Sequence, residues 1–226
     1  MPPDRGESWR RDPRAGVLVI LAGVAAASLA LLVAAILLAP AFVELDMVVS
    51  ALVRDIAWPW VLPLARGATW VGSFWPMAVV TVGTALVLMR IGRRPEAITM
   101  LVAVIGGTLL GQLMKLLVER ARPALDLARI PPLDSYSFPS GHALSSFLYL
   151  ACLAFIVLID EQRLGRAVAV IVACVAAGLA IALSRVYLGV HYAGDIVGGW
   201  LLGSAWLSFV VLISAYWGAG QPNGEP

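Results

Sequence analysis

The sequence predicts an all-α polytopic membrane protein, in which six transmembrane helices form one bundle and the whole chain, 1–226, is a single domain. Hydrophobic residues make up 61% of the chain and charged residues 13%, a balance unlike that of soluble domains. A hydrocarbon core takes about 20 residues of helix, and six apolar runs reach about that length. The net charge of +2 comes from scattered basic residues, so no nucleic acid is expected as a partner.

The six apolar runs follow one another along the chain. The first comes after four arginines and is too long for the roughly 7 to 15 residue core of a cleaved signal peptide, so we interpret it as a retained anchor. Segment 1–14 is then a cytoplasmic N-terminal tail, and 217–226 is a C-terminal tail. The predicted spans are 15–43, 67–89, 97–118, 141–159, 167–184 and 191–216.

Two of the segments between the spans have features of their own. Segment 44–57 mixes apolar residues with four charged ones, a pattern typical of a short helix lying along the membrane surface. Segment 119–139 is the only long connection and is rich in proline and charge, and such loops are usually functional or disordered. Cys152 and Cys174 lie inside apolar runs, so we interpret both as packing residues.

Three short polar sequences lie at the ends of predicted spans. They read K-L-L-V-E-R-A-R-P at 115–123, P-S-G-H at 139–142 and S-R-V-Y-L-G-V-H-Y-A-G-D at 184–195. The first closes the third span, the second opens the fourth, and the last closes the fifth and opens the sixth. Because consecutive spans cross in opposite directions, all of these ends lie on one face of the membrane. Both histidines of the chain and its one lysine fall within them.

Together the three sequences resemble the signature of the type 2 phosphatidic acid phosphatase family. That signature is Lys, six residues, Arg-Pro; then Pro-Ser-Gly-His; then Ser-Arg, five residues, His, three residues, Asp, and every defined position matches. The resemblance implies a membrane lipid phosphatase that needs no metal and no other cofactor. It also implies that His191 attacks phosphorus to give a phosphohistidine, that Asp195 supports His191, and that His142 protonates the leaving oxygen. Water then releases phosphate.

The residue types and their spacing fit this chemistry independently. His191 and Asp195 are four residues apart, so on one helix they share a face and the carboxylate can orient the imidazole. Gly189 offers a turn that would bring neighbouring motif residues toward one centre. Fixed cations stabilise the charge on a transferring phosphoryl group, and N–H groups at a helix start add donors. The predicted phosphate-binding residues are Lys115, Arg122, Arg185, Ser140 and Gly141.

Each of these residues, taken alone, has a simpler structural explanation. Lys115 stands where a lysine at a helix end can extend to the membrane surface. Ser140 can act only as a helix N-cap, and the carboxylate of Asp195 interacts favourably with a helix N-terminus whatever its function. A lone histidine at a membrane surface is more often structural than catalytic. The three motifs in order favour the catalytic interpretation.

The distribution of Lys and Arg between the two faces predicts the orientation, because cytoplasmic loops carry the excess. The face with the termini has nine: Arg5, Arg10, Arg11, Arg14, Arg90, Arg93, Arg94, Arg163 and Arg166. The opposite face has seven: Arg54, Arg66, Lys115, Arg120, Arg122, Arg129 and Arg185. We therefore expect both termini in the cytoplasm, with the motif face on the periplasmic or extracellular side of the cell (inner) membrane.

Other functions share parts of this pattern. A phosphotransferase would pass the phosphoryl group from His191 to a second lipid or sugar, and the motifs do not separate it from a hydrolase. An anion transporter would place charges near the midplane, whereas here nearly all lie at span ends. Soluble vanadate-dependent haloperoxidases carry the same signature, but six apolar spans argue against one. Undecaprenyl pyrophosphate, phosphatidylglycerol phosphate and phosphatidate are the leading substrates, unranked by the sequence, and the oligomeric state stays open.

Overall fold

The computed structural model describes residues 13–56, 58–131, 134–159 and 161–220, and most of these residues are helical. The helices are α2 (Pro13–Leu38), α3 (Pro40–Arg54), α4 (Val61–Val71), α5 (Phe74–Arg90), α6 (Arg94–Val118), α7 (Gly141–Leu158), α8 (Leu164–Tyr187) and α9 (Ala193–Gly220). A short 3-10 helix, η2 (Leu125–Leu127), lies in the loop after α6. The all-α prediction is confirmed: the described residues contain five helices long and apolar enough to span a membrane, or six if the bent pair of α4 and α5 forms one span.

Most of the two predicted tails, 1–14 and 217–226, lies outside the described residues. Helix α2 begins within the first, at Pro13, and α9 ends within the second, at Gly220.

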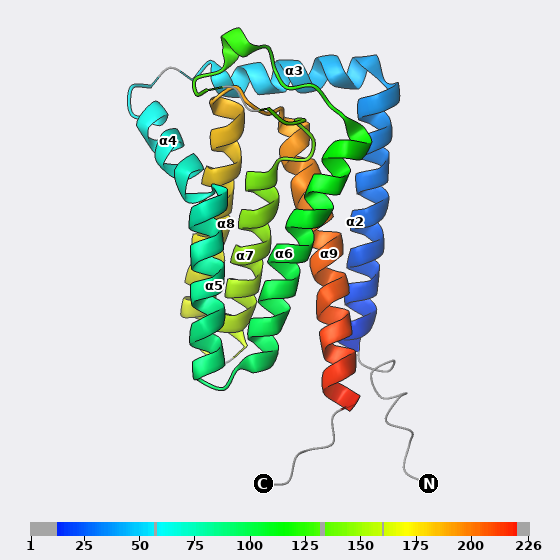
Figure 1. Cartoon of the computed structure of the whole chain (residues 1–226), viewed down its shortest axis with the longest axis vertical. Helices are drawn as coiled ribbons and strands as arrows, with labels where there is room; N and C mark the ends of the chain where they lie inside the picture. The colour runs from blue at the N-terminus through cyan, green and yellow to red at the C-terminus, as the bar shows by residue number, and fades with distance from the viewer. Residues whose placement is uncertain (1–12, 57, 132–133, 160, 221–226) are drawn as a thin grey trace.

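The long helices run side by side along the long axis of the molecule, and α3 lies across one end of the bundle (Figure 1). Helix α9 packs on α2, α6 and α7, and α8 packs on α7 and α4. A surface helix was predicted for 44–57, and the observed helix α3 begins four residues earlier and ends at Arg54, with residue 57 outside the described residues. Its position matters for the site, because α3 covers the end at which α6 and α8 finish and α7 and α9 begin.

The first two spans differ from the prediction at their ends. The first was predicted to continue to residue 43, but α2 stops at Leu38 because Pro40 begins a new helix. Proline lacks a backbone N–H and is favoured at the first position of a helix, so the chain turns there although it stays apolar. The second span is broken between α4 and α5, whose axes differ by 52°.

Glycines on α9 let that helix approach its neighbours closely. A Cβ atom at Gly203 would lie 2.7 Å from Cδ1 of Phe147 on α7, and one at Gly199 would lie 3.0 Å from the carbonyl oxygen of Ser140. Close packing of this kind between membrane helices relies on small residues. The buried core between α6, α7 and α9 includes Met100, Ala103, Leu144, Leu148 and Leu202.

Candidate active site

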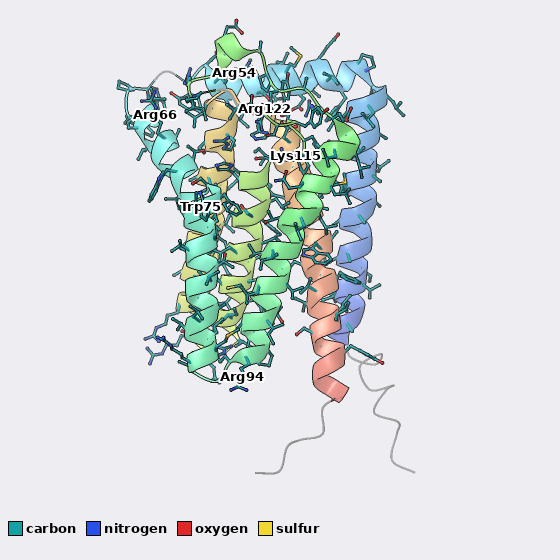
Figure 2. The ribbon with its side chains drawn as sticks, viewed as in Figure 1. Arg54, Arg66, Trp75, Arg94, Lys115 and Arg122 are labelled. Carbon is teal, nitrogen blue, oxygen red and sulfur yellow. The ribbon has the colours of Figure 1, made fainter. Side chains whose placement is uncertain are left out.

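The span ends that carry the three motifs meet at the end of the bundle covered by α3. Figure 2 shows Lys115 and Arg122 near this end, while Arg94 lies at the opposite end. Helix α6 leads to the first motif, α7 starts with the second, and the third lies where α8 ends and α9 begins. The folded chain therefore brings together the residues that the sequence selected as a site.

His191 and Asp195 form a buried pair at the start of α9. His191 is 2% exposed and Asp195 is fully buried, and the distance from His191 Nδ1 to Asp195 Oδ2 is 3.2 Å. The same oxygen accepts the backbone N–H of Tyr192 at 2.9 Å. This hydrogen bond fixes the carboxylate against the first turn of the helix. With Nδ1–H directed at Asp195, the Nε2 atom of His191 keeps its lone pair.

Arg122 stands on the other side of the His191 ring. Its Nη1 lies 3.2 Å from His191 Nε2 and donates to the carbonyl oxygen of Val190 at 2.6 Å. Its Nε and Nη2 donate to the carbonyl and hydroxyl oxygens of Ser135, at 2.7 and 2.9 Å. Helix α6 ends before Arg122, because Glu119 adopts a left-handed conformation with φ +49°. The position of the Arg122 guanidinium beside His191 is therefore set by the loop after α6 and not by the helix itself.

Lys115 and Ser140 take up positions that combine structural and chemical roles. Lys115 is buried in the last turn of α6, and its Nζ donates to the carbonyl oxygen of Tyr136 at 2.5 Å. Ser140 is the N-cap of α7, as its residue type predicts, and its backbone N–H donates to the carbonyl oxygen of Asp195 at 3.0 Å. The N–H groups of the next two residues, Gly141 and His142, have no partner within their own helix, as at any helix N-terminus.

Helix α4 supplies a contact that joins Arg185 and His142. Arg185 Nη1 donates to the hydroxyl of Thr69, and the His142 side chain hydrogen bonds to the Thr69 backbone. Among the described residues, Arg185 Nε is buried without a hydrogen-bond partner, which leaves one donor of this guanidinium for a substrate oxygen. The predicted turn at Gly189 is present, with φ +73°, and it connects α8 to the segment that holds His191.

Burial and the neighbouring charges together determine the protonation state of His191. Burial lowers the pKa of His191 to about 4; the hydrogen bond and charge of Asp195 oppose that shift, and the charges of Arg122 and Arg185 add to it. Burial also lowers the pKa of the Arg122 guanidinium. At neutral pH the imidazole is therefore neutral beside fixed cations. Within the described ranges, no group of three or more His, Cys, Asp or Glu residues is arranged to hold a metal ion.

Several residues of the site were not found from the sequence. Ser137 donates its hydroxyl to Asp195 Oδ2, and Arg120 donates to Asp195 Oδ1 at 2.7 Å. Asp46 on α3 holds the second arm of Arg120 at 2.7 Å. Their partners are 58 to 75 residues away in the chain, so no local pattern reveals them. The one available signal was that Arg120 lies inside the first motif.

The chain is similar to proteins of known families. The family model described as the PAP2 superfamily matches residues 96–219. A phosphatidylglycerophosphatase B of Bacillus subtilis is 32% identical over 162 residues, which are 70% of this chain and 77% of that protein. An undecaprenyl-diphosphatase of Sulfolobus acidocaldarius is 33% identical over 132 residues, which are 56% of this chain and 59% of that protein.

Two solved structures share the fold. The crystal structure of a transmembrane PAP2-type phosphatidylglycerolphosphate phosphatase from Bacillus subtilis has a TM-score of 0.76 and 25% identity, covering 84% of this chain and 94% of that one. The crystal structure of Aquifex aeolicus LpxE has a TM-score of 0.60 and 22% identity, covering 74% and 94%. With more than half of its length matched by the family model, and with the fold of a solved PAP2-type phosphatase, this chain belongs to the type 2 phosphatidic acid phosphatase (PAP2) superfamily.

Proposed function

We propose that this protein is a membrane phosphatase that hydrolyses a lipid phosphate or pyrophosphate through a phosphohistidine at His191. The observation that carries the proposal is the His191–Asp195 pair, buried at the end of the bundle with the Arg122 guanidinium 3.2 Å from His191 Nε2, the ring nitrogen that does not face Asp195. A neutral, oriented imidazole next to fixed cations has the properties of an activated nucleophile at a phosphate site.

The proposed reaction has two displacements at phosphorus. In the first, the lone pair of His191 Nε2 forms a bond to phosphorus as the bond to the lipid oxygen breaks, and His142 gives that oxygen a proton. In the second, water attacks phosphorus, the P–N bond breaks, and phosphate leaves. His142, now the base, takes the proton from the water, so that the enzyme returns to its starting state.

The cations supply stabilisation where negative charge is spread over the phosphoryl oxygens. Arg122 is held by Ser135 and Val190 beside the His191 ring, and Arg185 keeps a buried Nε donor unpaired within the described structure. Lys115 and the N-terminus of α7 add a further cation and backbone donors. With these groups in place, we propose that the reaction needs no metal ion.

The substrate is proposed to be an amphiphile that reaches the site from the bilayer. The site lies at the end of a helical bundle, and the described chain contains no separate soluble substrate domain. The names of the two relatives favour phosphatidylglycerol phosphate and undecaprenyl pyrophosphate as first candidates, with phosphatidate as the third. We also propose that the site faces the periplasmic or extracellular side, on the strength of the charge count.

The test is phosphate release by the purified protein from these three lipids, in detergent, with and without EDTA. We expect at least one lipid to be hydrolysed, at a rate that EDTA leaves unchanged, and vanadate to inhibit by mimicking pentavalent phosphorus. His191→Ala should abolish release. The matched control is Thr99→Ala, which removes a part-buried hydrogen bond to Ser214 at the other end of the bundle. Hydrolysis by His191→Ala, or loss in EDTA that magnesium restores, would contradict the proposal.

A further inference from the structure

A buried chain of three charged side chains links α3 to the His191–Asp195 pair. Arg120 lies between two carboxylates, with Nη1 2.7 Å from Asp195 Oδ1 and Nη2 2.7 Å from Asp46 Oδ2. The side chains of Arg120 and Asp46 are 7% and 4% exposed, and that of Asp195 is fully buried. The guanidinium also stacks over the Tyr192 ring, 4.3 Å from its centroid.

Fold stability alone does not account for these buried charges. Apolar residues of similar volume in place of a buried ion pair are often as stabilising or more so, because the charges have to give up their hydration. Arg120 and Asp46 also lie outside the set of residues that the proposed reaction uses. A role in positioning the residues that react would explain why charged side chains, and not apolar ones, are buried here.

Arg120 determines which oxygen of Asp195 meets His191. Since Oδ1 is taken by the guanidinium, Oδ2 is turned toward His191 Nδ1 at 3.2 Å and toward the N–H of Tyr192 at 2.9 Å. The Ser137 hydroxyl also donates to Oδ2, and the Ser137 N–H donates to the carbonyl oxygen of Arg120 at 2.7 Å. The planar guanidinium of an arginine fixes the direction of its hydrogen bonds as well as the place of its charge. Arg120 therefore holds the Asp195 carboxylate through its side chain and holds Ser137, which also donates to that carboxylate, through its carbonyl oxygen.

Asp46 holds Arg120 and, with Ser50, caps the start of α9. Asp46 Oδ1 accepts the N–H of Gly194 at 2.8 Å, and Ser50 Oγ accepts the N–H of Ala193 at 2.9 Å. These first-turn N–H groups have no partner within their own helix. The fit is tight, since a Cβ atom at Gly194 would lie 2.6 Å from Asp46 Oδ2. The surface helix α3 is thus fastened to the segment that carries the candidate nucleophile.

We infer that Arg120 and Asp46 are positioning residues for the reaction: Arg120 orients Asp195 toward His191, and Asp46 holds Arg120 in place from α3. The inference rests on the proposed function. Both residues act through Asp195, whose carboxylate keeps the proton on Nδ1 and directs Nε2 to phosphorus. A displacement of about 1 Å in a reacting group can cost about a hundredfold in rate, so the effect should fall on kcat more than on KM.

A purely structural role would look different. If the charges only anchored α3, their loss would lower stability and would reduce activity by the same factor whether or not Asp195 were present. Ser50→Ala is the matched control, because it removes one α3-to-α9 hydrogen bond and leaves all three charges in place.

The test is a double-mutant cycle on the purified full chain, with kcat and KM measured on nitrophenyl phosphate. Arg120→Gln should lower kcat by about thirtyfold or more with KM within about threefold, and Arg120→Lys should recover part of the loss. In an Asp195→Asn background, Arg120→Gln should cost less than about threefold, because the residue that it orients is already lost. Asp46→Asn should lower kcat by at least about fivefold, and Ser50→Ala by less than about twofold.

Equal losses from Arg120→Gln in both backgrounds would overturn the inference, as would wild-type kcat in Arg120→Gln and Asp46→Asn. Should Arg120→Gln fail to fold, as judged by thermal unfolding and size exclusion, Arg120→Lys and Asp46→Asn decide the matter in the same cycle. His191→Ala tests the proposed function separately. An inactive His191→Ala beside a fully active Arg120→Gln would refute the positioning role alone.

Discussion

The reactivity of His191 depends on which of its ring nitrogens carries the proton. Asp195 lies 3.2 Å from Nδ1, and the Arg122 guanidinium, which can only donate, lies 3.2 Å from Nε2, so the geometry favours the tautomer with the lone pair on Nε2. An imidazolium has no such lone pair. Because burial lowers the pKa of His191 to about 4, the ring is neutral, and able to attack phosphorus, throughout the physiological range.

This protonation state predicts a pH profile. As the pH falls from about 7 to about 5, the fraction of neutral His191 should barely change, and it should decline only as the pH approaches about 4. The measurement is the Cε1–H resonance of His191 in histidine-labelled protein, which is tractable because the chain has two histidines. His191→Ala identifies the signal. A midpoint near 6.5, the ordinary value for histidine, would show that burial does not control this ring.

His142 provides a second residue-scale prediction, because a general acid matters most for a poor leaving group. Phosphatidate expels an alkoxide, whereas nitrophenyl phosphate expels a far more stable anion. His142→Ala should therefore lower kcat/KM on phosphatidate at least about tenfold more than on nitrophenyl phosphate, within the hundredfold to ten-thousandfold typical of such catalysis. Equal losses on both substrates would leave His142 as a binding or structural residue.

The sequence predicted those site residues that contact a near neighbour in the chain or that occupy a defined position of a known motif. His191 and Asp195 are one helical turn apart, so their contact follows from spacing. Arg120 and Asp46 are 74 residues apart; Arg120 occupies an undefined position of the first motif, and Asp46 lies in a segment with the pattern of an ordinary surface helix. Only the fold puts them together, because the partner of a buried charge is set by tertiary packing.

At the scale of elements, the turn between α8 and α9 sets the geometry of the site. Arg185 ends one helix and His191 precedes the next, and Gly189 between them has φ +73°. Residues other than glycine rarely adopt this conformation. A Cβ atom there would also overlap the backbone of Leu127, so the turn is packed tightly against the loop that contains η2.

Gly189→Ala should therefore disturb both stability and activity. The left-handed conformation alone costs about 1 to 2 kcal/mol for an alanine, and relief of the overlap should move His191 relative to Arg185. We expect kcat to fall by more than about tenfold. Gly92→Ala is the matched control, since Gly92 has φ +83° but open space around its Cβ position. The Gly92→Ala variant should lose a similar amount of stability, because its backbone strain is similar, and should keep the kcat of the wild type. Equal kcat in both variants would contradict this role of the turn.

The helices themselves were predictable where apolar runs have clear ends. The spans from α6 to α9 begin and end within a few residues of the prediction, because charged or polar motifs interrupt the apolar pattern there. The turn from the first span into the surface helix was predicted a few residues too late, after residue 43, although Pro40 marks it, since hydropathy continues unbroken past that point. The break between α4 and α5 was missed for the same reason, and both breaks shape the end of the bundle that holds the site.

At the scale of the whole molecule, every motif lies at one end of the bundle, and the start of α2 and the end of α9 lie at the other (Figure 1). The orientation in the cell then decides which side of the membrane the chemistry serves. From the charge count, we propose that the site faces away from the cytoplasm.

Labelling with an impermeant thiol reagent on intact cells measures that orientation. Asp134→Cys, in the exposed loop near the site, and Ile91→Cys, 63% exposed at the other end, are made after Cys152 and Cys174 are replaced by alanine. We expect labelling at position 134 on intact cells and at position 91 only after lysis. The reverse pattern would put the site on the cytoplasmic side.

Formation of a covalent bond between His191 and phosphorus is the step on which the whole mechanism depends. Rapid mixing of the enzyme with phosphorus-labelled substrate, followed by an alkaline quench, should trap label on the protein, because a phosphohistidine survives base and is lost in acid. Peptide mapping should place the label on His191, and His191→Ala should carry none while retaining wild-type thermal unfolding. Label on another residue, or rapid turnover by the wild type with no label during the first milliseconds at any quench time, would contradict the nucleophilic role of His191.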